Sequence, residues 1–162
     1  MLGCAIFPLN GIYTVRTTVI FSLFLTLMVS GWANATVKNS QLRNLERSIV
    51  EKEWPACVKP RNYYDQVYCS AKVYNLMDNA LNDNYVALRK MLSKEQKKAL
   101  KKVQIAWLRE RDDTCSKLEN GSVIMNLGCS KRRTVESLYY ITEMKNNLSD
   151  FDLLLSEYKE QK

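Results

Sequence analysis

The fold is decided by residues 74–92, which read Tyr74-Asn-Leu-Met-Asp78-Asn-Ala-Leu81-Asn-Asp-Asn-Tyr85-Val-Ala-Leu88-Arg-Lys-Met-Leu92. The numbered residues recur at steps of four and three, so they lie on one face of an α-helix. Ser93 and Gln96 then have the spacing of a capping box, which ends this helix and begins another. The next helix is predicted from Lys94 to about Ser116. Its inward stripe is Leu100, Val103, Gln104, Trp107 and Arg111.

Helix-breaking residues are scarce in the rest of the chain. From residue 36 onward there are only two glycines and two prolines, which favours long helices joined by short connections. Further helices are predicted at 41–53, 124–146 and 150–160, with an irregular segment at 57–65 and a loop at 119–122. The predicted fold is therefore all-α, a compact antiparallel domain of four to five helices.

Residues 1–35 have the pattern of a secretory signal peptide. A single charge, Arg16, precedes an apolar run of about 13 residues, and Ala33-Asn-Ala35 matches a small-residue cleavage site. We expect cleavage after Ala35, which leaves a domain at 36–162 in an exported protein, periplasmic or secreted. The alternative is an uncleaved membrane anchor, but the apolar run is short for a helix that crosses a bilayer.

Four cysteines follow the signal peptide, and an even number in an exported chain predicts two disulfides. Of the three possible pairings, Cys57–Cys69 and Cys115–Cys129 close the shortest loops and are favoured. A zinc site with four cysteine ligands is the alternative. The cysteine spacings of 12, 46 and 14 residues lack the close pairs that such sites carry.

The composition argues against an enzyme. The chain of 162 residues has a formal net charge of +7 and no histidine, so Ser-His-Asp triads, Cys-His pairs and histidine-containing zinc sites are excluded. The carboxylate pairs Asp112-Asp113 and Asp150/Asp152 are the remaining acid–base candidates. Sequence neighbours point to different sides of a helix, so catalysis is not expected there. We predict a binding protein with no cofactor and no metal.

The excess positive charge lies between Arg89 and Arg111, where nine basic residues face two acidic ones. Such a patch suits a polyanion, for example lipid phosphates or anionic wall polymers. A solvated helix face that keeps the protein soluble is the alternative. A nucleic acid is not an expected partner of an exported protein. The candidate polyanion-binding residues are Lys94, Lys97, Lys98, Lys101 and Lys102.

Two acidic segments are candidate contacts for a protein partner. The loop closed by Cys115 and Cys129 is pre-organised, which lowers the entropy cost of inserting it into a cleft. Its candidate contact residues are Glu119, Asn120 and Gly121, and those of the C-terminal helix are Asp150 and Asp152. The alternative interpretation of the disulfide loop is a simple connection.

Polar residues also lie on the predicted inward faces, namely Asp78, Asn82, Gln104 and Arg111. A buried charge needs a partner, so we expect Asp78 to contact Arg111. A structural network that fixes helix packing is favoured over a ligand pocket.

Several of these residues form motifs that resemble the lysozyme inhibitor LprI-like (N-terminal domain) family of small exported bacterial proteins. The motifs are Tyr74-x3-Asp78-x2-Leu81-Asn82-x2-Tyr85, Leu100-x3-Gln104-x2-Trp107-x3-Arg111-Asp112-x2-Cys115, Gly121, Cys129, and Arg132-Arg133-Thr134 with Leu138. The resemblance covers about 57–138, with the helix at 150–160 as an addition. It implies inhibition of a lysozyme-like muramidase. The alternative function is an envelope-associated structural or stress protein whose lysine-rich helix face binds anionic surface polymers.

Overall fold

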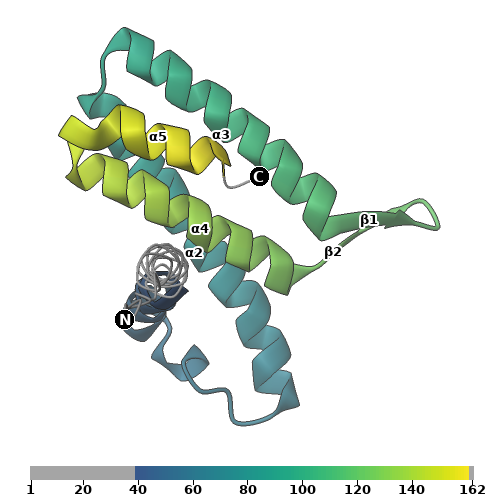
Figure 1. Cartoon of the computed structure of the whole chain (residues 1–162). Helices are drawn as coiled ribbons and strands as arrows, with labels where there is room; N and C mark the ends of the chain where they lie inside the picture. The colour runs from purple at the N-terminus through teal and green to yellow at the C-terminus, as the bar shows by residue number, and fades with distance from the viewer. Residues whose placement is uncertain (1–38, 161–162) are drawn as a thin grey trace, which may run out of the picture. The chain divides into compact units, whose positions relative to one another are not determined.

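A computed structural model describes residues 39–160, and within them the fold is a set of helices with one small hairpin (Figure 1). The predicted all-α class is confirmed. The signal peptide predicted at 1–35 lies outside the described residues. Residues 39–53 are helical, and the later elements are η1 (Pro55–Cys57), α2 (Tyr63–Met91), α3 (Lys94–Cys115), β1 (Ser116–Glu119), β2 (Ser122–Met125), α4 (Leu127–Asn146), η2 (Leu148–Asp150) and α5 (Phe151–Glu160).

The first turns of α2 and α3 are fixed by side-chain caps. At Ser93, the hydroxyl accepts from the Gln96 backbone N–H at 3.2 Å, while the Gln96 side chain accepts from the Ser93 backbone N–H at 3.0 Å, so the predicted capping box is confirmed. In α2, Asn62 accepts from the backbone N–H of Asp65 at 2.9 Å. This cap starts the helix at Tyr63. The prediction of irregular structure throughout 57–65 was therefore wrong for its last three residues.

The predicted loop at 119–122 is instead the turn of an antiparallel hairpin, which pairs Leu118 with Val123. Asn120 and Gly121 have φ angles of 51° and 77°, and two positive φ angles give the tight turn whose twist matches paired strands. The strand β2 extends to Met125, so the fourth helix begins at Leu127 rather than at Ile124.

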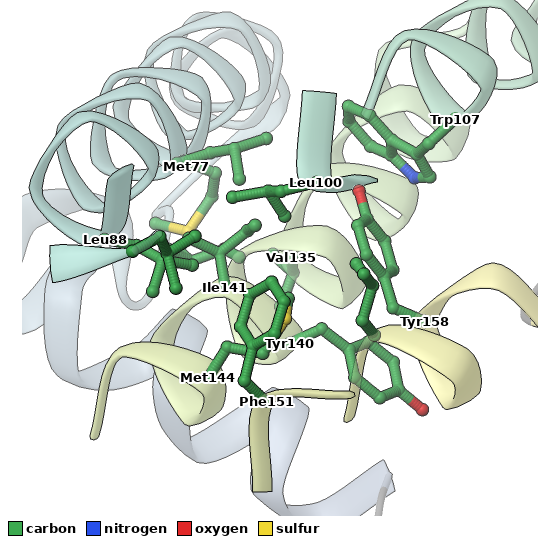
Figure 2. Close-up of a cluster of buried hydrophobic side chains, with 14 of the residues drawn as sticks. Met77, Leu88, Leu100, Trp107, Val135, Tyr140, Ile141, Met144, Phe151 and Tyr158 are labelled. Carbon is green, nitrogen blue, oxygen red and sulfur yellow. The ribbon is translucent and has the colours of Figure 1, made fainter. Parts of the chain in front are cut away.

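The helix α4 is the centre of the packing and contacts α2, α3 and α5 (Figure 1). Its buried side chains lie on most of its circumference, as a central helix requires. Figure 2 shows the resulting core, in which Ile141 and Met144 of α4 lie among side chains from the other three helices. The labelled partners are Met77, Leu88, Leu100, Trp107, Phe151 and Tyr158.

Two disulfides close short loops at the margins of this core, with the predicted pairing. Cys57–Cys69 joins η1 to α2 across a Cα–Cα distance of 5.3 Å. Cys115–Cys129 joins the last residue of α3 to the first turn of α4 across 5.4 Å. A backbone hydrogen bond of 2.8 Å from Asn126 N–H to the Cys115 carbonyl lies beside the second disulfide. The hairpin is thus clamped at its base.

We expect Met77→Ala to lower the free energy of unfolding by about 2–5 kcal/mol, because Met77 is 0% exposed and its truncation leaves a cavity. Met91→Ala, in the same helix but at a site 53% exposed, is the matched control and should change it by less than about 0.5 kcal/mol. Urea unfolding with intact disulfides measures both. Equal effects would contradict the assignment of the core.

Candidate functional site

The polar residues of the inward faces meet at the guanidinium group of Arg111, which is only 7% exposed. Its Nη1 donates to Asp78 of α2 at 3.1 Å and to the hydroxyl of Thr134 of α4 at 3.4 Å. Asp112, the next residue of α3, is bound at 2.9 Å. The structure therefore contains the Asp78–Arg111 contact expected from the sequence, together with a link to α4 that the sequence did not indicate.

The surroundings of Arg111 keep it charged. Burial by itself would lower the pKa of Arg111, but the hydrogen bond to Asp112 and the nearby charges raise the pKa on balance. The guanidinium carbon also lies 5.1 Å from the ring centroid of Trp107, within the range of a cation–π interaction. Burial raises the pKa of the neighbouring Tyr74 phenol, and Arg111 opposes that shift.

The other two residues of the predicted network are placed differently. Asn82 extends it by donating to Asp78 at 3.4 Å. Gln104 is in a separate buried cluster, where it accepts from the hydroxyl of Tyr158 at 2.8 Å while that hydroxyl also bonds Ser137. Burial raises the pKa of Tyr158, so the phenol stays protonated and donates. Because these contacts join protein groups to one another, and the longest-range ones link different helices, a structural role is the better interpretation of both clusters.

The hairpin carries an apolar face that the sequence interpretation missed. Leu118 and Val123 are directly opposite each other and are 74% and 72% exposed. Met125 lies on the same face because strand residues two apart share a side of the sheet. Lys117, Glu119 and Ile124 lie on the other face, where Lys117 and Glu119 form an ion pair. The dipeptide Asn120-Gly121 was the sequence signal for this hairpin.

The two groups of predicted protein contacts are far apart, although all their members are exposed. Glu119, Asn120 and Gly121 form the hairpin tip, which projects away from the helices where α4 begins (Figure 1). Asp150 and Asp152 lie beyond the other end of α4. A helix of this length spans about 30 Å. The two groups therefore form separate candidate surfaces rather than one site.

The predicted lysine face lies on α3 beside the stripe of buried residues Leu100, Gln104, Trp107 and Arg111. Its members are exposed, apart from the half-buried Lys97. None of the five lysines forms an ion pair with any residue of the described range 39–160. The structure therefore leaves this face of α3 with an uncompensated positive charge.

An aromatic cluster around the Cys57–Cys69 disulfide is a further exposed surface, and nothing in the sequence periodicity had indicated it. Trp54 and Tyr68 meet edge to face with ring centroids 6.4 Å apart. The ammonium of Lys72 lies over both rings. Tyr63 and Tyr64, in the first turn of α2, are highly exposed. Aromatic residues of this kind are enriched in protein interfaces.

The residues from 39 to 160 contain no group of three or more histidine, cysteine, aspartate or glutamate side chains that could hold a metal ion. Within the same residues, no helix combines the length and the apolar character that crossing a membrane requires.

A family model described as "Lysozyme inhibitor LprI" matches residues 57–140, more than half of the chain. The chain belongs to this family. The match runs from the first cysteine of the Cys57–Cys69 disulfide into the buried part of α4, so it includes the Arg111 network, α3 and the hairpin, whereas α5 lies outside it. The family's description names an inhibitor rather than an enzyme. No curated protein and no solved structure matches the chain.

If the Arg111 network is structural, Asp78→Ala will lower the free energy of unfolding by about 1–3 kcal/mol, because it removes a charged hydrogen-bond partner of a buried guanidinium. Asp112→Ala removes a more exposed partner and should cost less than about 1 kcal/mol. Urea unfolding measures both changes. A ligand-binding role would instead require an Asp78→Ala variant with normal stability and lost binding of a partner.

Proposed function

We propose that the chain is an exported, non-enzymatic binding protein that inhibits lysozyme-like muramidases, with the apolar face of the hairpin as the contact surface. The observation that carries this proposal is the exposure of Leu118 and Val123 on a disulfide-clamped hairpin in a chain of the LprI family. Burial of these exposed side chains by a partner breaks no contact within the fold. Removal of their apolar surface from water stabilises the complex.

The geometry of the hairpin favours insertion into a cleft. Its base is closed by Cys115–Cys129, and its tip is a two-residue turn, so little conformational freedom is lost on binding. A narrow two-stranded element that is held in this way can be inserted into the cleft of a partner at a low entropy cost.

The charge around the hairpin is balanced, so it does not repel a basic partner as the lysine-rich part of α3 would. Animal lysozymes are generally basic, and a basic partner is repelled by a basic contact surface. Asp112 and Asp113 precede the hairpin and Glu119 lies within it. Arg111 pairs with Asp112, Lys117 pairs with Glu119, and Arg132 is exposed near the start of α4, so negative and positive charges balance around the hairpin. The acidic segment with Asp150 and Asp152 is a second candidate contact, at the other end of α4.

A lysozyme turbidity assay with the purified, naturally processed protein tests the proposal. We expect inhibition at micromolar protein, at both low and moderate salt, because an apolar contact is less sensitive to screening than an ionic one. A protein that leaves lysozyme activity unchanged at micromolar concentration would overturn the proposed inhibition.

Variants of the hairpin test the contact surface. Leu118→Thr combined with Val123→Thr keeps strand-forming residues but removes the apolar contact, and we expect inhibition to weaken by about tenfold or more. Ile124→Thr on the opposite face is the matched control and should inhibit normally. Charge reversal at Lys97, Lys98, Lys101 and Lys102 should also leave inhibition intact. Equal losses in the double variant and in the control would exclude the proposed face.

A further inference from the structure

The exposed face of α3 is unusual because it combines lysines with apolar side chains. Lys94, Lys98, Lys101 and Lys102 lie on one arc of the helix. Ile105 follows Lys98 by seven residues, and Leu108 follows Lys101 by seven, so both continue the same arc two turns later. Ile105 is 40% exposed and Leu108 37%. The apolar residues of α3 are thus not confined to its buried stripe, because the solvent face also combines charged and apolar side chains.

The lysines of this face do not help the fold. Like charges four residues apart destabilise a helix, and α3 has three such pairs of lysines. They are Lys94 and Lys98, Lys97 and Lys101, and Lys98 and Lys102. Lys94 and Lys97 also lie in the first turns, where the helix dipole favours negative charge. No ion pair with a described residue offsets these effects. A ligand that neutralises the face would remove the repulsion.

Positive charge alone would bind any polyanion, but the apolar residues of this face reduce the range of possible ligands. A soluble anionic polymer offers no apolar region that Ile105 and Leu108 could contact. An anionic lipid surface does, because basic residues bind its phosphates while neighbouring apolar side chains enter the boundary between headgroups and acyl chains.

We propose that the solvent face of α3, formed by Lys94, Lys98, Lys101, Lys102, Ile105 and Leu108, docks the protein on an anionic phospholipid surface. The ammonium groups bind lipid phosphates, and the two apolar side chains insert between the headgroups. The helix lies parallel to the surface, because its buried stripe packs on α4 and α5 and the lysine face is turned away from them. This surface is separate from the hairpin, so the proposal does not depend on inhibition of a muramidase.

Vesicle co-sedimentation of the purified, naturally processed protein tests the docking, with phosphatidylcholine vesicles that contain or lack phosphatidylglycerol. We expect binding only to the anionic vesicles, and weaker binding as salt rises. The variant with Lys98→Gln, Lys101→Gln and Lys102→Gln should bind about a hundredfold more weakly, since each lysine near such a surface contributes about fivefold. The matched control removes three exposed charges elsewhere with Arg43→Gln, Arg47→Gln and Lys59→Gln, and should bind nearly as the original chain does.

The apolar residues distinguish a lipid surface from a soluble polymer. Ile105→Ser, a change between residues of similar helix propensity at an exposed site, should weaken vesicle binding several-fold. Unchanged vesicle binding by that variant, together with equal affinity for soluble polyphosphate, would overturn lipid docking in favour of a general polyanion site. Equal losses in the α3 variant and its charge-matched control, or equal binding to neutral vesicles, would also overturn it. Lysozyme inhibition measured on the same variants should stay unchanged, so the two proposals fail independently.

Discussion

The arrangement of the helices depends on satisfying one buried positive charge, the guanidinium of Arg111. A charge that is almost fully removed from water is tolerated only where partners replace the lost hydration, and removal of a partner leaves a strong penalty. Here the partners come from three helices, with Asp78 on α2, Asp112 on α3 and Thr134 on α4. The register of α2 and α4 against α3 is thereby fixed by polar contacts, which are more directional than apolar packing.

This constraint also determines where the candidate surfaces lie. Arg111 is one turn before Cys115, so the residue that orients α3 lies beside the disulfide that clamps the hairpin. With Leu100, Trp107 and Arg111 turned toward the core, the lysine arc of α3 must face solvent. The same alignment places the C-terminal end of α3 beside the start of α4, and the hairpin that connects them extends outward (Figure 1).

Periodicity in the sequence was sufficient to predict the helices, and loop length was sufficient to predict the disulfides, because both are local properties of the chain. The Asp78–Arg111 contact was also predictable, since each residue lies on the inward stripe of its own helix and a buried charge needs a partner. The partner of Gln104 was not predictable. It is Tyr158, which is 54 residues away on α5, and only the packing of α5 against α3 brings the two together. The hairpin was missed because the apolar run from Val123 to Met125 was assigned in part to the next helix. The dipeptide Asn120-Gly121 marked the turn, and Asn126 marked the true start of α4 as its N-cap.

The net charge of +7 at first suggests that the protein would repel a basic partner, but the positions of the charges remove the difficulty. From Lys98 to Cys115 the helix rises about 25 Å, whereas charges in physiological salt are screened over about 8 Å. A basic protein at the hairpin would therefore be affected mainly by the nearby charges, and hardly by the lysine face of α3. These nearby charges balance, with Asp112, Asp113 and Glu119 against Arg111, Lys117 and Arg132. The two proposed surfaces then act independently. An anionic surface bound to the lysines would therefore leave the affinity of the hairpin for its partner unchanged, and one molecule could occupy both surfaces at the same time.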